Sequence, residues 1–251
     1  MPHIDLNCDL GESFGAYTIG MDEKVIPFIT SANVACGFHA GDPLVMQRTV
    51  ALCKQSSAAV GAHPGFPDLQ GFGRRQMKLT PAEAKACVQY QIGALKAFCD
   101  AAGVPLHHVK PHGALYNMAG KDRALADAIC AAVKESAPGA VLLALSGSEM
   151  VKAAQAIGLP VANEMFADRG YRPDGSLVPR GTPGAMIEDE DEAIARVIRM
   201  VTEGKVTAND GTDIAIQADS VCVHGDGPKA LAFVEKIGAA LQAAGVELKA
   251  F

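Results

Sequence analysis

Short β-like runs alternate with helical segments along the whole 251-residue chain. Each strand-plus-helix unit takes roughly 36 residues, which is typical of a (β/α) barrel or a doubly wound sheet. Because strands that alternate with helices form βαβ units, the pattern predicts an α/β fold with about seven parallel strands. No linker interrupts it, so we expect a single domain spanning residues 1–251. The predicted strands are 4–8, 32–36, 58–62, 106–110, 141–145, 161–166 and 221–224, with 214–218 as a further short run.

Capping residues predict where several helices begin and end. Asp42 stands before Pro43, the order of an N-cap followed by proline at the first helical position. Thr80 and Glu83 have the spacing of a capping box, and Gly103 ends the Ala-rich segment that follows them. Further helices are predicted over 122–137, 148–157, 191–203 and 228–244.

One long stretch, 166–184, carries no regular pattern and is rich in Gly, Pro, Arg and Asp. Irregular segments of this length inside a compact domain are usually functional loops. We therefore interpret it as a loop or lid over a site, and not as a boundary between domains.

The charge balance excludes some classes of partner. The chain carries 22 Lys and Arg against 28 Asp and Glu, a formal net charge of −6, and it has no basic tract. Such a chain is a poor match for nucleic acid or for an anionic membrane surface. No apolar run approaches the roughly 18 residues of a membrane span, and the first residues do not resemble a signal peptide. We expect neither nucleic acid nor a membrane as a partner.

The cysteines indicate a reducing compartment. The chain has 7 of them, an odd number, scattered through mostly apolar segments without a C-x-x-C pair. This usage is typical of buried free thiols and not of a disulfide framework. The expected location is the cytoplasm.

Polar residues gather where the predicted strands end. In parallel α/β folds the carboxyl ends of the strands lie on one face, and that face carries the site. We therefore expect side chains that are distant in sequence to surround one cavity. After successive strands, the polar residues are Asn7, Asp9 and Glu12; His39 and Asp42; His63 and Asp68; Lys110, His112, Tyr116 and Asn117; Asn163, Glu164, Asp168 and Arg169; and His224 and Asp226.

The histidines in these clusters suit metal or proton chemistry. Neutral imidazoles and carboxylates are ligands for divalent transition metals, and three protein ligands with one open position suit a site that activates water. The other three histidines, His3, His107 and His108, lack this setting, and we expect them to be structural or on the surface. The four that follow predicted strands beside Gly or Pro are His39, His63, His112 and His224.

Cationic residues at the strand ends have several open roles. Lys110 is able to stabilise a developing oxyanion, to bind a carboxylate, or to act as a base if its pKa is depressed. Arg74, Arg75, Arg169 and Arg180 offer planar forks for a substrate carboxylate or phosphate. No Walker phosphate loop, dinucleotide fingerprint or G-x-S-x-G nucleophile elbow is present in the sequence.

Six sequence blocks together resemble the LamB/YcsF family. They are DLNCDLGESFG, ANVACGFHAGDP, VGAHPGFPDLQGFGRR, VKPHGALYN, FADRGY followed by LVPRG, and VCVHGDG. The blocks span nearly the whole chain, and their combination is highly specific. The resemblance implies a fold similar to the glycoside hydrolase/deacetylase superfamily, a distorted (β/α) barrel.

The resemblance also implies an activity and partners. The family's reaction is the 5-oxoprolinase reaction, the ATP-dependent opening of 5-oxo-L-proline (pyroglutamate) to L-glutamate, and it requires two further subunits, B and C. ATP would be a co-substrate handled with those partners. Because a five-membered lactam is a resonance-stabilised amide, phosphorylation of its oxygen would make the ring carbon electrophilic. Our hypothesis is that subunits B and C activate the lactam and that this chain binds it and opens the ring. Whether copies of the chain associate with one another stays open.

Site roles follow from the same resemblance. Related deacetylases bind a divalent metal with an Asp from the first strand and two later histidines, which match Asp9, His63 and His112 here, with His39 as a substitute. Whether this branch keeps the metal stays open. The candidate catalytic residues are Asp9, His39, Lys110, His224 and Asp226, and the candidate substrate contacts are Asn7, Arg74 and Arg169. Two alternatives remain: a stand-alone metal-dependent amidase or carbohydrate deacetylase, and a non-catalytic lactam-binding subunit.

Overall fold

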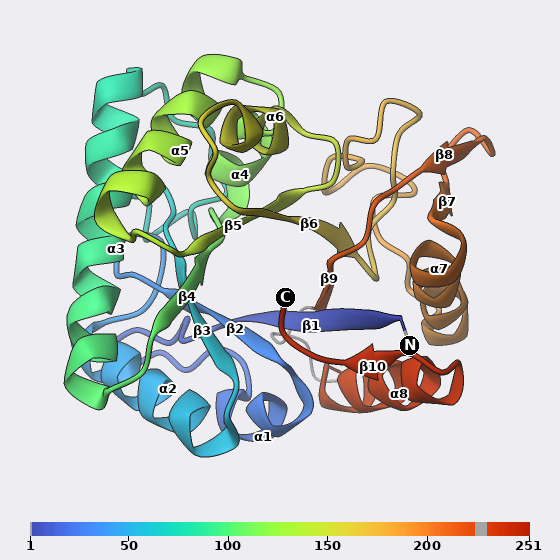
Figure 1. Ribbon diagram of the computed structural model, residues 1–251, viewed down its shortest axis with the longest axis horizontal. Helices are drawn as coiled ribbons and strands as arrows, with labels where there is room; N and C mark the ends of the chain where they lie inside the picture. The colour runs from blue at the N-terminus through green and yellow to red at the C-terminus, as the bar shows by residue number, and fades with distance from the viewer. Residues whose placement is uncertain (1, 224–229) are drawn as a thin grey trace.

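Seven parallel strands close into a barrel in the computed structural model, which describes residues 2–223 and 230–251. The strands follow one another around the barrel in chain order, and β9 closes the ring by pairing with both β6 and β1 (Figure 1). The predicted seven-stranded (β/α) barrel is confirmed. The barrel strands are β1 (His3–Leu10), β2 (Ser31–Ala35), β3 (Ala59–His63), β4 (Leu106–Val109), β5 (Val141–Leu145), β6 (Val161–Phe166) and β9 (Ser220–Val223).

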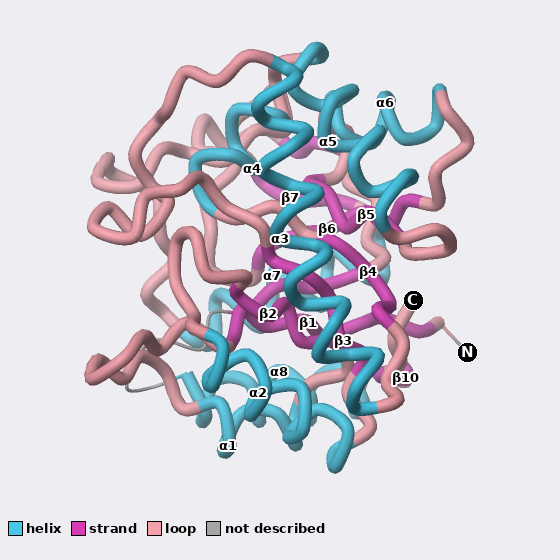
Figure 2. Tube along the Cα trace, turned by 90° about the vertical axis from the view of Figure 1, so that its left-hand side faces the viewer, coloured by secondary structure: helices cyan, strands magenta, loops and turns pink. Residues whose placement is uncertain are grey.

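Helices surround the strands, and many of the loops gather on the side away from the two chain termini (Figure 2). No helix in the described part of the chain is both long and apolar enough to cross a membrane. The helices are α1 (Asp22–Val25), the 3₁₀ turn η1 (Ile26–Phe28), α2 (Pro43–Ser56), α3 (Pro81–Ala102), α4 (Gly113–Ala119), α5 (Arg123–Ser136), α6 (Glu149–Ala156), α7 (Glu190–Glu203) and α8 (Ala230–Ala243).

The predicted helix caps are confirmed. The Asp42 carboxylate accepts hydrogen bonds from the first-turn amides of α2, and Thr80 and Glu83 form the capping box of α3. Gly103 ends α3 with a φ of 66°, a conformation that glycine adopts without a steric penalty. Local capping chemistry thus fixes the loops that precede α2 and α3.

Among the described residues, two pairings between named strands lie outside the barrel. β7 (Lys205–Thr207) and β8 (Asp213–Ala215) form an antiparallel hairpin, so the predicted run 214–218 overlaps a strand that is not part of the barrel. β10 (Glu247–Leu248) adds a short parallel pairing to the start of β1. The barrel itself therefore needs only the seven strands.

Polar side chains fill part of the barrel interior. Along β1 the apolar residues Ile4 and Leu6 belong to the hydrophobic core, while Asp5, Asn7 and Asp9 alternate with them and bond to other barrel strands. Side chains normally pack the inside of such a barrel in apolar layers. Here the layers are polar, so each buried group needs hydrogen-bond partners.

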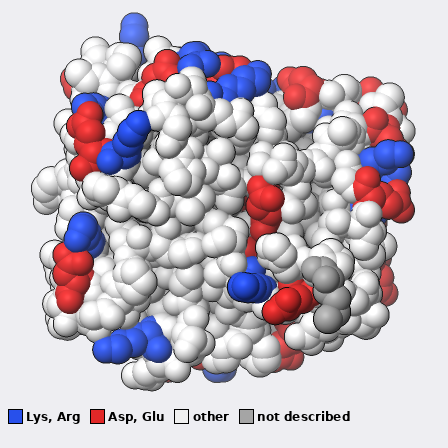
Figure 3. Space-filling model, viewed as in Figure 1, with Lys and Arg blue, Asp and Glu red and all other residues white. Residues whose placement is uncertain are grey.

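The segment 166–184 forms the predicted loop. Two isolated bridges connect its backbone, Tyr171 with Leu177 inside the loop and Arg169 with Met186 just after it, and residues of this loop line the pocket described below. On the face in Figure 3, acidic and basic side chains of the described residues are interspersed and do not form a basic stripe.

Candidate active site

A pocket of about 1040 Å³ lies over the carboxyl ends of the barrel strands. Its lining includes Asp9 from β1, His63 from β3, Lys110 just after β4 and Phe166 from β6. These residues are far apart in the sequence and meet because parallel strands end on one face. The expected convergence of the predicted residues therefore occurs for Asp9, His63 and Lys110.

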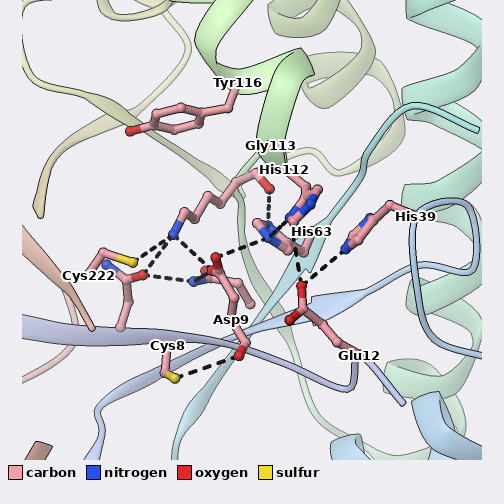
Figure 4. Close-up of polar contacts among 12 residues, drawn as sticks. Cys8, Asp9, Glu12, His39, His63, His112, Gly113, Tyr116 and Cys222 are labelled. Atoms are coloured by element: carbon pink, nitrogen blue, oxygen red, sulfur yellow. Dashed lines mark hydrogen bonds and ion pairs between the residues drawn. The ribbon is translucent and has the colours of Figure 1, made fainter. Parts of the chain in front are cut away.

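Four buried side chains form what we call the Glu–His cluster: Glu12, His39, His63 and His112. One donor atom from each lies within 4.8 Å of the others. Glu12 and His39 follow β1 and β2, His63 ends β3, and His112 is the N-cap residue of α4. Figure 4 shows the three imidazoles turned toward one another beside Glu12.

Hydrogen bonds to carbonyls fix the tautomers of two of these rings. His63 donates from Nδ1 to the Lys110 carbonyl at 2.7 Å, and His112 donates from Nε2 to the Phe72 carbonyl at 2.8 Å. In the neutral rings, His63 Nε2 and His112 Nδ1 then carry lone pairs, and these atoms face each other at 2.9 Å. Two such lone pairs repel unless a proton or a metal ion lies between them. The donor set therefore fits a cation.

His39 completes the cluster from the side. Its ring stacks on His112 with centroids 3.7 Å apart, and its Nε2 lies 3.4 Å from Glu12 Oε1. Among the described residues, nothing accepts or donates a hydrogen bond at His39 Nδ1. Glycines make room for these rings, because a Cβ added at Gly65 would lie 2.6 Å from His39 Nδ1, and one at Gly73 would lie 2.9 Å from His112 Cδ2.

Burial keeps two of the imidazoles neutral. Desolvation, reinforced by the neighbouring histidines, lowers the pKa of His39 well below its usual range. Desolvation and His63 likewise lower the pKa of His112 to about 3. Metals bind the neutral form of imidazole, so both rings are in the ligand state at neutral pH.

Lys110 lies between two carboxylates beside the cluster. Its Nζ is 2.9 Å from Asp9 Oδ1 and 2.7 Å from Glu164 Oε1, and Asn7 Oδ1 and Cys222 Sγ both lie at 3.2 Å. Burial opposes its charge, but Asp9, Cys222 and Glu164 outweigh burial and raise the pKa of Lys110 well above its usual value. Of the roles left open by the sequence, these partners favour a fixed cation over a base.

Asp9 is the ionised partner of this cation. Burial disfavours its charge, yet His63 and Lys110 together lower the pKa of Asp9 well below its usual range. Its Oδ2 lies 3.3 Å from His63 Nε2, so Asp9 connects Lys110 to the Glu–His cluster. Glu164 is held on its other oxygen by the hydroxyl of Tyr116, which donates to Oε2 at 2.6 Å.

The predicted substrate contacts have different positions. Arg74 is exposed and lines the pocket, with its guanidinium carbon 4.9 Å from the Phe72 ring centroid. Arg169 also lines the pocket, but it is buried and donates to the carbonyls of Val178 and Ala185 in its own loop. Asn7 is fully buried beneath Lys110 and does not line the pocket.

Two predicted catalytic residues, His224 and Asp226, lie outside the described residues. Three residues of the site had no role assigned from the sequence. Glu12, Tyr116 and Glu164 had been grouped there with the polar residues at strand ends. Their positions after β1, near the start of α4 and within β6 were the available signal. What the sequence lacked was the distance between them.

Fold and site together define a seven-stranded (β/α) barrel with a buried carboxylate–histidine cluster at the carboxyl ends of its strands. The model of the LamB/YcsF family matches residues 4–251. This chain belongs to the LamB/YcsF family, as its sequence blocks had indicated.

Relatives with curated names are similar over nearly their full length. A Clostridium beijerinckii protein, named as the A subunit of 5-oxoprolinase, is 64% identical over 248 residues, covering 99% of this chain and 97% of that protein. Its Bacillus subtilis namesake is 57% identical over 250 residues, covering 100% and 97%. The crystal structure of a lactam utilization protein from Thermus thermophilus superposes with a TM-score of 0.94 at 51% identity, covering 99% of this chain and 100% of that one.

Proposed function

We propose that this chain is the ring-opening component of a 5-oxoprolinase, a hydrolase that converts 5-oxo-L-proline to L-glutamate. The observation that carries the proposal is the position of Asp9 and Lys110 beside the Glu–His cluster on the wall of one pocket. The names of relatives that are 64% and 57% identical supply the substrate class. A carboxylate base next to buried ligands suits hydrolysis of an amide.

We propose that the Glu–His cluster holds a divalent metal ion. Neutral imidazole nitrogens are ligands for such ions, so His63 Nε2 and His112 Nδ1, whose lone pairs face each other, would hold it. Glu12 would supply a negative charge and His39 a fourth donor. When bound, such an ion acts as a Lewis acid toward a water molecule or the lactam carbonyl. The sequence had proposed Asp9 as a ligand. In the structure it is a carboxylate oxygen of Glu12 that lies within 4.8 Å of a ligand atom of each of the three histidines.

Asp9 is the proposed general base. Its Oδ2 lies 3.3 Å from His63 Nε2, Asp9 lines the pocket, and Lys110 keeps the carboxylate ionised. Oδ2 takes a proton from water as the water oxygen bonds to the lactam carbon. It returns that proton to the ring nitrogen as the carbon–nitrogen bond breaks, which yields the amine and, from the phosphorylated lactam, an acyl phosphate. A second water then hydrolyses the acyl phosphate to the new carboxylate of glutamate and inorganic phosphate. An arginine of the pocket, Arg74 or Arg169, binds the α-carboxylate of the substrate.

The partner subunits supply activation. In this proposal subunits B and C use ATP to phosphorylate the lactam oxygen, since an unstrained amide opens slowly, and this chain opens the activated ring. The 7 cysteines are all free, which suits the cytoplasm, where we place the complex.

An omission assay tests the function. Glutamate release from 5-oxo-L-proline and ATP is measured with the three subunits together and with each left out, and again with Asp9→Asn in place of the wild-type chain. We expect release only from the complete complex and almost none with Asp9→Asn. Release by the isolated chain without ATP would point to the stand-alone amidase. Normal release with Asp9→Asn would contradict the assigned base.

A further inference from the structure

The two oxygens of Asp9 have different surroundings. Oδ1 accepts from Lys110 Nζ at 2.9 Å and from Asn33 Nδ2 at 2.9 Å, while Oδ2 lies 3.3 Å from His63 Nε2. The geometry thus ties Oδ1 to the barrel interior and turns Oδ2 toward the cluster. The orientation of the Asp9 carboxylate therefore depends on the hydrogen bonds that hold the Asn33 side chain.

Asn33, on β2, is fixed at all three of its polar positions. Its amide nitrogen donates to Asp9 Oδ1 and, at 2.8 Å, to Asn7 Oδ1, and its Oδ1 accepts from His108 Nε2 at 2.7 Å. If the amide were reversed, its oxygen would face two other acceptors. Because Asp9 and Asn7 both accept, the Asn33 oxygen faces His108 Nε2, and the Nε2–H tautomer of His108 completes this orientation.

His108 reaches this position because the neighbouring strand has no side chain there. It is fully buried on β4, and a Cβ added at Gly61 on β3 would lie 2.1 Å from its Nε2. The imidazole occupies the space that a side chain at position 61 would fill. The sequence had assigned His108 a structural or surface place, and its burial beneath the site was not visible there.

We propose that Asn33 and His108 are positioning residues for ring opening, which hold Asp9 so that Oδ2 is the oxygen presented to water. The inference rests on the proposed function of Asp9. Neither residue lines the pocket, so each acts through Asp9 and not on the substrate. Loss of the His108 donor leaves the buried Asn33 oxygen unpaired, and loss of the Asn33 amide leaves Asp9 Oδ1 held by Lys110 alone.

Steady-state kinetics of the assembled complex test the proposal with Asn33→Ala, His108→Leu and His108→Gln. The glutamine keeps an N–H donor for Asn33, and the leucine does not. Residues that orient a site from behind are typically worth about 10–100-fold. We expect kcat to fall by about that factor in Asn33→Ala and His108→Leu with KM unchanged, and to recover largely in His108→Gln.

Thr49→Val is the control for general destabilisation, because it removes a buried hydroxyl of α2 that bonds Val45 of its own helix and the Asp22 side chain, neither of which lines the pocket. It should lower Tm without lowering kcat. Equal loss of kcat in Thr49→Val, equal loss in both His108 variants, or a rise in KM alone would overturn the positioning role. Full kcat in Asn33→Ala together with an inactive Asp9→Asn would also overturn it while leaving the proposed function intact. A wild-type complex that releases no glutamate would instead refute the function.

Discussion

Two buried polar groups in this barrel differ in how completely their hydrogen bonds are made. Deep in the interior, Asp5 accepts from the hydroxyls of Thr30, Ser31 and Ser220, and Ser220 in turn accepts from Asn7. We call these five residues the closed network. In the Glu–His cluster, by contrast, His63 and His112 face each other with lone pairs and His39 Nδ1 has no partner among the described residues.

The difference indicates which of the two groups supports the structure and which is able to bind a ligand. A completed buried hydrogen bond contributes roughly 1 kcal/mol to stability, whereas a buried polar group left unpaired costs about 1–3 kcal/mol. The closed network avoids that cost, so it is able to act as a rigid floor under Asp9. The Glu–His cluster leaves nitrogen lone pairs without a partner beside a pocket. A ligand bound there would offset the cost of these unpaired atoms. The predictions below test this contrast, beginning with the largest effect.

Removal of the one carboxylate in the Glu–His cluster gives the largest expected effect. Glu12→Gln keeps the shape but removes the negative charge that balances a divalent ion. We expect bound metal, measured on protein purified without chelator, to be lost. Glutamate release by the complex should fall about 10³-fold, since Lewis-acid stabilisation is worth several kcal/mol. Glu135→Gln, at an exposed ion pair with Lys85, is the control and should change neither. Full activity of Glu12→Gln without metal would place the chemistry elsewhere.

A smaller effect is expected from crowding His39. In Gly65→Ala the new Cβ would meet His39 Nδ1 at 2.6 Å, and Gly65 is unable to yield because the Gln91 side chain bonds both its N–H and its carbonyl. We expect metal affinity, measured by competition with a chelator, to fall about 10–100-fold. Gly93→Ala is the matched control, since nothing lies within 4 Å of its added Cβ. Unchanged affinity in Gly65→Ala would remove His39 from the ligand set.

A substitution in the closed network should lower the stability of the protein and leave kcat nearly unchanged. Ser220→Ala removes the hydroxyl between Asn7 and Asp5, and we expect the free energy of unfolding in urea to fall by about 1–3 kcal/mol. The value of kcat should stay within about twofold, because the base and the cluster keep their own partners. Ser56→Ala, on the exposed end of α2, should change stability by less than about 0.5 kcal/mol. A large loss of kcat in Ser220→Ala at unchanged stability would reverse the assignment.

The smallest effect concerns the pH dependence of the closed network. Burial raises the pKa of Asp5 above its usual value of 3.8, despite the hydroxyls of Ser220, Ser31 and Thr30. A raised pKa in the folded state favours folding while the group is protonated, and this contribution is lost as the pH rises through the folded pKa. The unfolding free energy of wild type should therefore decrease relative to Asp5→Asn between pH 4 and pH 7.

The exposed Asp210 should change the unfolding free energy with pH in the opposite direction. The Thr212 hydroxyl and amide lower the pKa of Asp210, so its contribution to stability is present at neutral pH and lost on acidification. Wild type should therefore gain relative to Asp210→Asn as the pH rises through the lowered folded pKa toward 3.8, and the difference should stay flat over the interval in which Asp5 loses its contribution. A difference for Asp5→Asn that changed in the same direction as that for Asp210→Asn would argue against the buried carboxylate as the cause.

Local sequence signals located much of this architecture. The strands β5 and β6 lie where the apolar runs predicted them, and the caps at Asp42 and Thr80 are formed as expected. These features depend on residues within one turn or one strand of each other. The same signals offered 214–218 as another strand, whereas residues 213–215 pair with β7 in a hairpin outside the barrel, because a short apolar run does not show which strand it pairs with. The predicted end of the last barrel strand at residue 224 lies outside the described residues.

The roles of Glu12, Glu164 and His108 needed coordinates. Each belongs to a different strand or loop, and only the closure of the barrel sets which atoms come within bonding distance. Arg169 illustrates the same point, since its type and place after β6 suggested a substrate contact, but only the coordinates show that it lines the pocket while the carbonyls of Ala185 and Val178 take two of its donors.

The sequence by itself determined the alternation of strands and helices, the family, and the end of the barrel that carries the polar residues, because these follow from periodicity, capping and motif blocks along the chain. The tertiary structure alone decided that Glu12 joins the three histidines, that Lys110 is shared between Asp9 and Glu164, and that His108 bonds the Asn33 side chain, which in turn bonds Asp9. The physical reason is that hydrogen bonds and ion pairs act over about 3 Å in space, and residues such as Asn7 and Ser220 reach that distance only after the seven strands close on one another.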